Sequence, residues 1–274
     1  MTLNNILVAL DGSPASDVAL QGAVSIHKAY NAHVSAMVSL NVQTGASGDI
    51  FPWVPAAIRK NIEKAASDAH DAVERAFMEA TRDLDQEKVH MIERVTATDT
   101  SVSEASRFFD FTVVGIPTDM ESSKLHPDRI ALLSGRPVMA FPEGNDATRV
   151  ADKAAIAWDG SRAAARALSS SMRVLSTKED VILITVDAPP KAKVENSGLD
   201  PKTALERQGI AANWINADSK GRGIATTLLA SAKDHGAEIL IMGAFEHSKF
   251  REDLFGGVTR DVMAATDIPV FLAH

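Results

Sequence analysis

A glycine pair at the start of a predicted helix is the feature of this sequence with the clearest chemical meaning. Residues 238–261 begin as a short apolar strand, break at Gly243, pass through a polar loop and re-form as a helix at residues 256–259, Gly-Gly-Val-Thr. Such a helix start turns backbone N–H groups toward one point, where the helix dipole adds partial positive charge. That point favours an anion, most often a phosphate, and the Thr259 hydroxyl offers one more donor. The alternative is that these glycines serve only turns and packing.

The polar loop before these glycines carries charged residues that suit the same ligand. His247, Lys249 and Arg251 can pair with phosphate oxygens or remain solvated, and Glu246 with His247 can orient a water molecule against a terminal phosphate. The sequence contains no Gly-x-Ser-x-Gly elbow, no Walker-type loop and no other assembled nucleophile and base. The loop therefore favours a binding module over an enzyme, with slow nucleotide hydrolysis through Glu246 and His247 as the alternative.

The histidines and the absence of cysteine argue against a resident metal. None of the eight histidines forms a His-x-His or His-x-x-x-His pair, and the chain has no cysteine. Thiolate metal sites and a disulfide framework are thereby excluded. The sequence predicts no dedicated metal site, although Mg²⁺ can arrive with the phosphates of a nucleotide.

Composition and charge narrow the classes of partner. The 274 residues carry a formal net charge of -8 and no long Lys/Arg cluster, which argues against nucleic-acid binding. No segment approaches the roughly 18 apolar residues of a membrane helix. The N-terminus enters an apolar strand directly, without the basic region and cleavage site of a signal peptide. The sequence therefore predicts an unprocessed cytoplasmic protein.

Short apolar runs alternate with helical patterns along the whole chain. Runs too short for helices and rich in Ile and Val predict strands that are buried on both faces. The predicted strands are residues 5–10, 33–42, 88–95, 111–114, 138–141, 154–158, 181–186, 211–215, 238–242 and 269–272. Strands that alternate with helices at these spacings predict an α/β fold, a parallel sheet with helices on both faces.

The order of elements repeats after the polar cluster at residues 142–149. Three pairs of segments correspond: residues 11–13 with 159–161 (both Asp-Gly-Ser), 114–115 with 242–243 (Val-Gly and Met-Gly), and 136–138 with 268–270 (both ending Pro-Val). This internal duplication predicts two domains, residues 1–146 and 150–274.

Distant segments of the second copy are expected to meet at one edge of its sheet. Ligands of open parallel sheets bind beyond the carboxyl ends of the strands, where the strand order reverses. There the turn at residues 158–161 and the end at residues 242–243 converge with the glycine loop. Asp159 can accept from a ribose hydroxyl or a base amino group, or it can end the strand and, with Ser161, cap the next helix.

These residues resemble the universal stress protein family. The similarity lies in an Asp-Gly-Ser strand end in each copy and in the spacing from Gly243 through residue 246 to residues 256–260, Gly-Gly-Val-Thr-Arg; as two tandem copies it covers nearly the whole chain. The family implies two Rossmann-like five-stranded parallel sheets with strand order 3-2-1-4-5, and ATP or AMP as the ligand. Its residue roles imply adenine and ribose contacts from Ala157, Trp158, Asp159 and Val186, and a phosphate cradle of Met242, Gly243, Gly256, Gly257, Val258 and Thr259. His247, from the charged loop, completes the predicted nucleotide contacts.

Two departures from the family pattern qualify this resemblance. Glu246 stands where ATP-binding members usually have glycine, and a carboxylate there repels a polyphosphate unless it turns away or a cation intervenes. In the first copy, Gly115 is followed by Ile-Pro-Thr-Asp, and residues 134–137 lead into the last strand without a Gly-Gly-Val-Thr equivalent. The first copy is therefore expected to be a scaffold or a dimerisation unit that retains only the Asp11 end of a pocket.

The sequence thus predicts a cytoplasmic tandem stress-response protein that binds an adenine nucleotide in its second domain. The first domain would be structural or mediate association, including a homodimer. A protein with two vestigial pockets is the rival hypothesis, in which the aromatic loop around Phe51 and Trp53 docks a partner.

Overall fold

The structure is a computed structural model of the 274-residue chain. It describes residues 3–38, 55–92, 99–120, 123, 125–187, 198–244 and 257–274. The aromatic loop at residues 51–53, proposed above as a docking surface, lies outside the described residues, as do Glu246, His247, Lys249, Arg251 and Gly256.

Strands and helices alternate along the chain as predicted. The strands are β1 (Asn5–Leu10), β2 (His33–Val38), β3 (Val89–Met91), β4 (Phe111–Ile116), β5 (Val138–Pro142), β6 (Lys153–Ala157), β7 (Asp180–Val186), β8 (Asn213–Ala217), β9 (Ile239–Gly243) and β10 (Val270–Ala273). The helices are α1 (Pro14–Tyr30), α2 (Ala56–Thr81), α3 (Asp99–Ser106), α4 (Pro127–Ser134), α5 (Arg162–Leu175), α6 (Pro201–Glu206), α7 (Ile224–Asp234) and α8 (Val258–Ala265), with a 3₁₀ turn, η1 (Gln86–Lys88).

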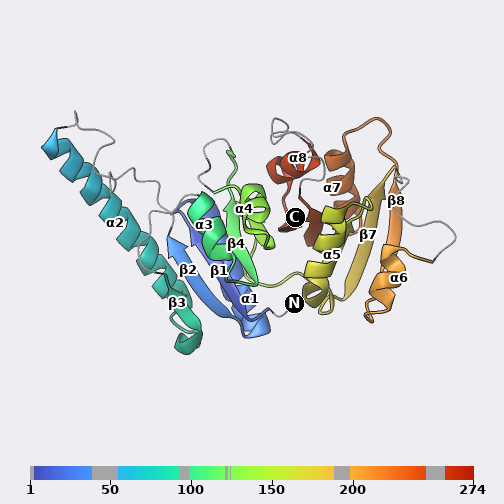
Figure 1. The fold of residues 1–274 in the computed structure, drawn as a ribbon, viewed down its shortest axis with the longest axis horizontal. Coiled ribbons are helices and arrows are strands. Elements are labelled where there is room, and N and C mark those ends of the chain that lie inside the picture. The colour runs from blue at the N-terminus through green and yellow to red at the C-terminus, as the bar shows by residue number, and fades with distance from the viewer. Residues whose placement is uncertain are drawn as a thin grey trace.

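The strands form one continuous sheet, where the sequence predicted two. Their order is β3-β2-β1-β4-β5-β10-β9-β6-β7-β8, so each half keeps the expected order 3-2-1-4-5. All described pairings are parallel except β5 with β10, which is antiparallel and places Phe271 opposite Met139. The two last strands would otherwise be apolar sheet edges with unpaired backbone groups, and pairing them removes both edges. Figure 1 shows the halves side by side, the first in blue to green and the second in yellow to red.

Two apolar layers cover the two faces of this sheet. One buried cluster joins α1, α2, α5 and α6 to the sheet and includes Phe77, Phe141 and Phe271. The other joins α3, α4, α7 and α8 and includes Ile130 and Met263. Both clusters draw residues from both halves, so the core is continuous across the β5–β10 junction. In the part of the chain that is described, no helix has the length and apolar character needed to cross a bilayer.

Helix α4 and the 3₁₀ turn η1 were not predicted from the sequence. Helix α4 nevertheless has clear boundaries. It begins with Pro127 at its first position and ends at Gly135, whose φ of 65° is left-handed. Proline at the first helical position and glycine after the last are the usual helix boundaries, so the signal was present. Only eight residues long, the helix offers too few turns for a clear apolar stripe. The predicted strand at residues 211–215 also shifts, to Asn213–Ala217.

Candidate functional site

The turn between β6 and α5 contains Trp158 and Asp159. Oδ1 of Asp159 accepts a hydrogen bond from the backbone N–H of Ser161 at 2.9 Å. Oγ of Ser161 in turn accepts from the backbone N–H of Ala164 at 2.9 Å, which caps α5. The first half repeats both bonds, with Asp11 accepting from Ser13 N–H at 3.0 Å. Ser161 is therefore the residue that caps α5, and Asp159 supports it through the hydrogen bond to the Ser161 N–H group.

Gly243 ends β9 at a point of very close packing. A Cβ atom on Gly243 would lie 2.5 Å from the carbonyl carbon of Ala163 and 2.6 Å from the nitrogen of Ala164, in the first turn of α5. In the first half, a Cβ on Gly115 would lie 2.3 Å from the carbonyl oxygen of Ala15. Only glycine fits these contacts, because backbone atoms cannot move aside as side chains can. The packing role is thus the same in both halves.

The N-terminus of α8 has no side-chain cap. Its N-cap residue, Gly257, has φ 122° and ψ -175°, a conformation that L side chains rarely adopt, and glycine has no side chain that could cap the first turn. The first bond inside the helix runs from Asp261 N–H to the carbonyl oxygen of Gly257. The N–H groups of residues 258–260 therefore have no acceptor within the helix. Val258 is half-buried and the Thr259 side chain is buried.

Strand β7 ends beside the same edge, at Val186. Val186 pairs with Ala217 of β8 and packs partly buried against the core. The next residue, Asp187, has φ 54°, and its Oδ1 accepts from the Ser219 N–H at 2.9 Å. Hydrogen bonds from Ser219 hold the pKa of the Asp187 carboxyl below its usual value. Sequence analysis missed Asp187 because its left-handed backbone has no signal beyond the residue type.

The sheet order brings these segments together. Strand β6 pairs with β7 on one side and with β9 on the other, so the strand order reverses at β6. The carboxyl ends of β6, β7 and β9 carry Ala157, Val186, Met242 and the residues that follow them, at one edge of the second half. That is the location where open parallel sheets bind ligands. Gly257, Val258 and Thr259 begin the helix that crosses from β9 to β10, whereas His247 and Gly256 lie outside the described residues.

His274 at the C-terminus and Arg166 of α5 lie at this edge, and the sequence did not indicate either residue. His274 Nδ1 lies 2.8 Å from the carbonyl oxygen of Ala244, directly after β9. Arg166 of α5 donates through Nη1 to the carbonyl oxygen of His274 at 2.7 Å. These contacts fix the last residue against the end of β9, and they place a cationic side chain near the strand end that carries Gly243.

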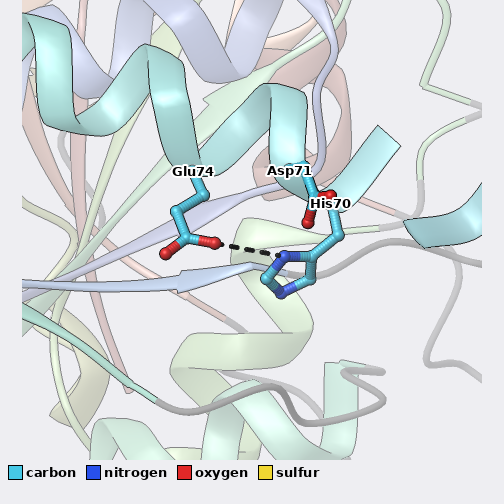
Figure 2. A group of neighbouring side chains, drawn as sticks. All are labelled: His70, Asp71 and Glu74. Atoms are coloured by element: carbon cyan, nitrogen blue, oxygen red, sulfur yellow. Dashed lines mark ion pairs between the residues drawn. The ribbon is translucent and has the colours of Figure 1, made fainter. Parts of the chain in front are cut away.

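A separate group of possible metal ligands lies on α2. The ligand atoms of His70, Asp71 and Glu74 lie within 4.8 Å of one another, and His70 Nδ1 is 3.8 Å from Glu74 Oε2 (Figure 2). The signal in the sequence is the spacing of His70 and Glu74 by four residues, which places both on one face of a helix. Asp71 has a further interaction of its own. An i,i+4 ion pair accounts for this geometry, and the prediction that the chain has no dedicated metal site stays a prediction.

Comparisons with known proteins identify the fold. No protein-family model matches the chain, and no curated protein sequence matches it. A universal stress protein from Archaeoglobus fulgidus DSM 4304 superposes with a TM-score of 0.71 at 16% identity, over 99% of this chain and 96% of that one. A putative universal stress protein from Pseudomonas aeruginosa UCBPP-PA14 gives 0.58 at 13% identity, over 99% and 93%. A protein of unknown function from Pseudomonas aeruginosa PAO1 gives 0.57 at 13%, over 99% and 92%.

These similarities extend over nearly the entire chain, both halves included. The sequence identities are low, so the similarity concerns the arrangement of the elements. The chain has the Rossmann-like α/β fold of its structural neighbours, the universal stress proteins.

Proposed function

We propose that this chain is a tandem universal stress protein of the cytoplasm whose second domain, residues 150–274, binds an adenine nucleotide. The first domain, residues 1–146, has a structural or associating role. The proposal treats the protein as a nucleotide-responsive binding module. One observation carries it: the uncapped N-terminus of α8 stands at the edge where the strand order reverses at β6. Backbone N–H groups without an acceptor inside their own helix, together with the helix dipole, suit the phosphates of ATP or AMP at such an edge.

The other end of the ligand is assigned to the β6 turn. Asp159 uses Oδ1 for Ser161, and a ribose hydroxyl would donate to the same carboxylate. Backbone groups after Ala157 and Val186 would contact the adenine, as the family resemblance implies. Mg²⁺, if it takes part, would arrive with the phosphates. Gly243 allows the end of β9 to pack against the first turn of α5, and Met242 is buried on the opposite face of the sheet.

Matched variants of the two halves test this assignment. Asp159→Ala and Asp11→Ala remove the same strand-end hydrogen bond, so they should lose similar stability. Only Asp159→Ala also removes the ribose contact, and it should weaken nucleotide affinity about tenfold. Isothermal titration of both variants and the intact chain with ATP, ADP and AMP, each with and without Mg²⁺, measures this difference. If the intact chain binds none of the three at millimolar concentration, or if both variants lose affinity equally, the assignment fails.

A further inference from the structure

A cavity of about 260 Å³ lies between α1 and α5, over the junction of β5 with β10. It is bordered by Glu238 and Ile239, where β9 begins, whereas the candidate nucleotide edge lies where β9 ends. The cavity and that edge are therefore at opposite ends of the second half. The cavity is larger than an engineered protein cavity of about 150 Å³ that binds benzene. This is room for a small organic molecule.

The walls of this cavity are mainly apolar. Phe111, Met139 and Phe141 come from the sheet, while Ile26 of α1 and Val174 of α5 face each other across the space. Each of these five side chains is buried. Pockets lined in this way hold the apolar part of a ligand, and a few polar groups set its orientation.

Asn145 supplies one such polar group. Its Oδ1 atom is buried and has no hydrogen-bond partner among the described residues. Its Nδ2 atom donates to the carbonyl oxygen of Asp267 at 3.2 Å, which fixes the orientation of the amide. A buried acceptor without a donor is costly, and a ligand O–H or N–H would remove that cost.

Lys178 supplies the second. Its ammonium group donates to the carbonyl oxygen of Ala151, the one hydrogen bond that the described structure gives it. Burial lowers the pKa of this amine, and the carboxylates of Asp152 and Glu238 act in the opposite direction. Two of its three N–H groups are therefore free to donate to a ligand.

The charges beside the cavity already balance. Arg149 forms ion pairs with Glu238 and with Asp152, and Lys178 lies close enough to both carboxylates to be influenced by them. Two cations thus face two carboxylates. Asp146 also lines the cavity and interacts with Arg149, but it is exposed to solvent and accepts a hydrogen bond from Thr148. A charged ligand would leave one charge uncompensated in a poorly solvated place, which is unfavourable.

We propose that this cavity binds a small uncharged organic molecule, an apolar ring or chain that carries one hydroxyl or primary amide group. The polar group donates to Asn145 Oδ1 and accepts from Lys178 Nζ, and the apolar body fills the space between Ile26 and Val174. The proposal is independent of nucleotide binding, because it uses the other end of the second half.

Benzyl alcohol is a suitable probe, with benzoate and benzylamine as charged analogues of similar size. Titration of the full chain, labelled with ¹³C at the methionine methyl groups, should shift the Met139 signal in a saturable way and leave that of Met263, on the opposite face, in place. Val174→Phe fills the cavity and should abolish the shift. Lys178→Met should weaken binding about tenfold, whereas Lys202→Met, on the exposed side of α6, should not change it.

Three results would overturn the proposal. The first is that none of the three probes shifts Met139. The second is that benzoate or benzylamine binds as tightly as benzyl alcohol, which refutes an uncharged ligand. The third is that folded Lys178→Met binds benzyl alcohol as the intact chain does. Since Lys178→Met keeps the apolar walls, it provides this test even if Val174→Phe does not fold.

Discussion

The two crossover helices α4 and α8 hold equivalent places in the two halves, but they begin differently. Each has eight residues, packs on the same face of the sheet and leads into the last strand of its half. Helix α4 begins with Pro127, which has no N–H group, while α8 begins with Val258 after a glycine in a left-handed conformation. The first half therefore offers fewer donors at the position where the second half presents an uncapped helix start.

Other paired features have the same structural role in both halves. Gly115 and Gly243 each pack closely against the first turn of a helix. Asp11 and Asp159 each accept a hydrogen bond from the backbone N–H group of the serine two residues later. These shared residues thus maintain the same local structure in both halves, whereas the N-terminus of α8 differs from that of α4. Positions at which the two copies differ, such as the starts of α4 and α8, are therefore the better candidates for a function that only one copy has.

The largest expected effect concerns the shared glycines. Gly243→Ala and Gly115→Ala should each lower the free energy of unfolding by about 3 kcal/mol, because a Cβ would meet helix backbone in both halves. Urea unfolding measures the loss. Gly223→Ala, whose nearest neighbour would be Thr226 Oγ1 at 3.9 Å, is the control and should change stability by less than about 1 kcal/mol. A large loss in one half only would contradict the equivalence of the two packing sites.

A second substitution converts the α8 start into that of α4. Val258→Pro removes one N–H group at a position where proline is well tolerated, so the fold should persist. Affinity for ATP or AMP should fall about tenfold, since a hydrogen bond to a charged phosphate is lost. Calorimetry measures this affinity, and circular dichroism checks the fold. Unchanged affinity would show that the difference between the helices has no bearing on the ligand.

The smallest expected effect on stability concerns two equivalent acidic residues, Asp110 before β4 and Glu238 before β9. Glu238 accepts from the N–H groups of Asp152 and Lys153, and Asp110 accepts likewise from Asn4 and Asn5. The hydrogen bond from Arg149, together with these two N–H groups, lowers the pKa of Glu238 to about 2. A lowered carboxyl pKa contributes stability above the unfolded value, and that contribution is lost as the pH falls from about 4.5 to 2.

Glu238→Gln should therefore cost about 1 kcal/mol at pH 7, an amount reduced by the partial exposure of the pair, and should flatten the decline of stability between pH 4.5 and 2. Asp110→Asn, which breaks no arginine pair, should cost less at pH 7. Thermal unfolding at a series of pH values measures both variants. A pH profile of Glu238→Gln identical to that of the intact chain would contradict the assigned pKa.

Much of the fold was accessible from the sequence because its signals are local. Short segments of strand character located all ten described strands, although β3 and β8 differ from their predicted bounds, and the repeated Asp-Gly-Ser and Met-Gly or Val-Gly ends indicated the duplication. The pairing of β5 with β10 was not predicted. The apolar sequence of each strand indicates that the strand is buried, but it does not indicate which strand lies beside it. Val270 and Ala140, which pair in this junction, are 130 residues apart in the sequence, so local sequence patterns do not indicate their contact.

The candidate site was predictable in its location but not in the roles of its residues. Topology alone places Ala157 and Met242 at one edge, as expected from their strand-end positions. Spacing could not separate the ligand role of Asp159 from its capping role, since Asp11 has the same spacing and the same bond. Arg166 and His274 were missed because only the folded chain brings the C-terminus beside β9.

The antiparallel seam between β5 and β10 gives this single chain an approximate twofold axis, since the strand order reads the same from either edge. In a symmetric homodimer, every residue near such an axis must meet its own copy. A covalently joined pair is free of that constraint. Across this axis Tyr30 meets Thr177 at 2.9 Å and Phe111 meets Phe271, so the surfaces have become complementary without remaining identical. Joining the two halves in one chain thereby allows the cavity over the β5–β10 junction to be asymmetric, although the arrangement of the strands around it is symmetric.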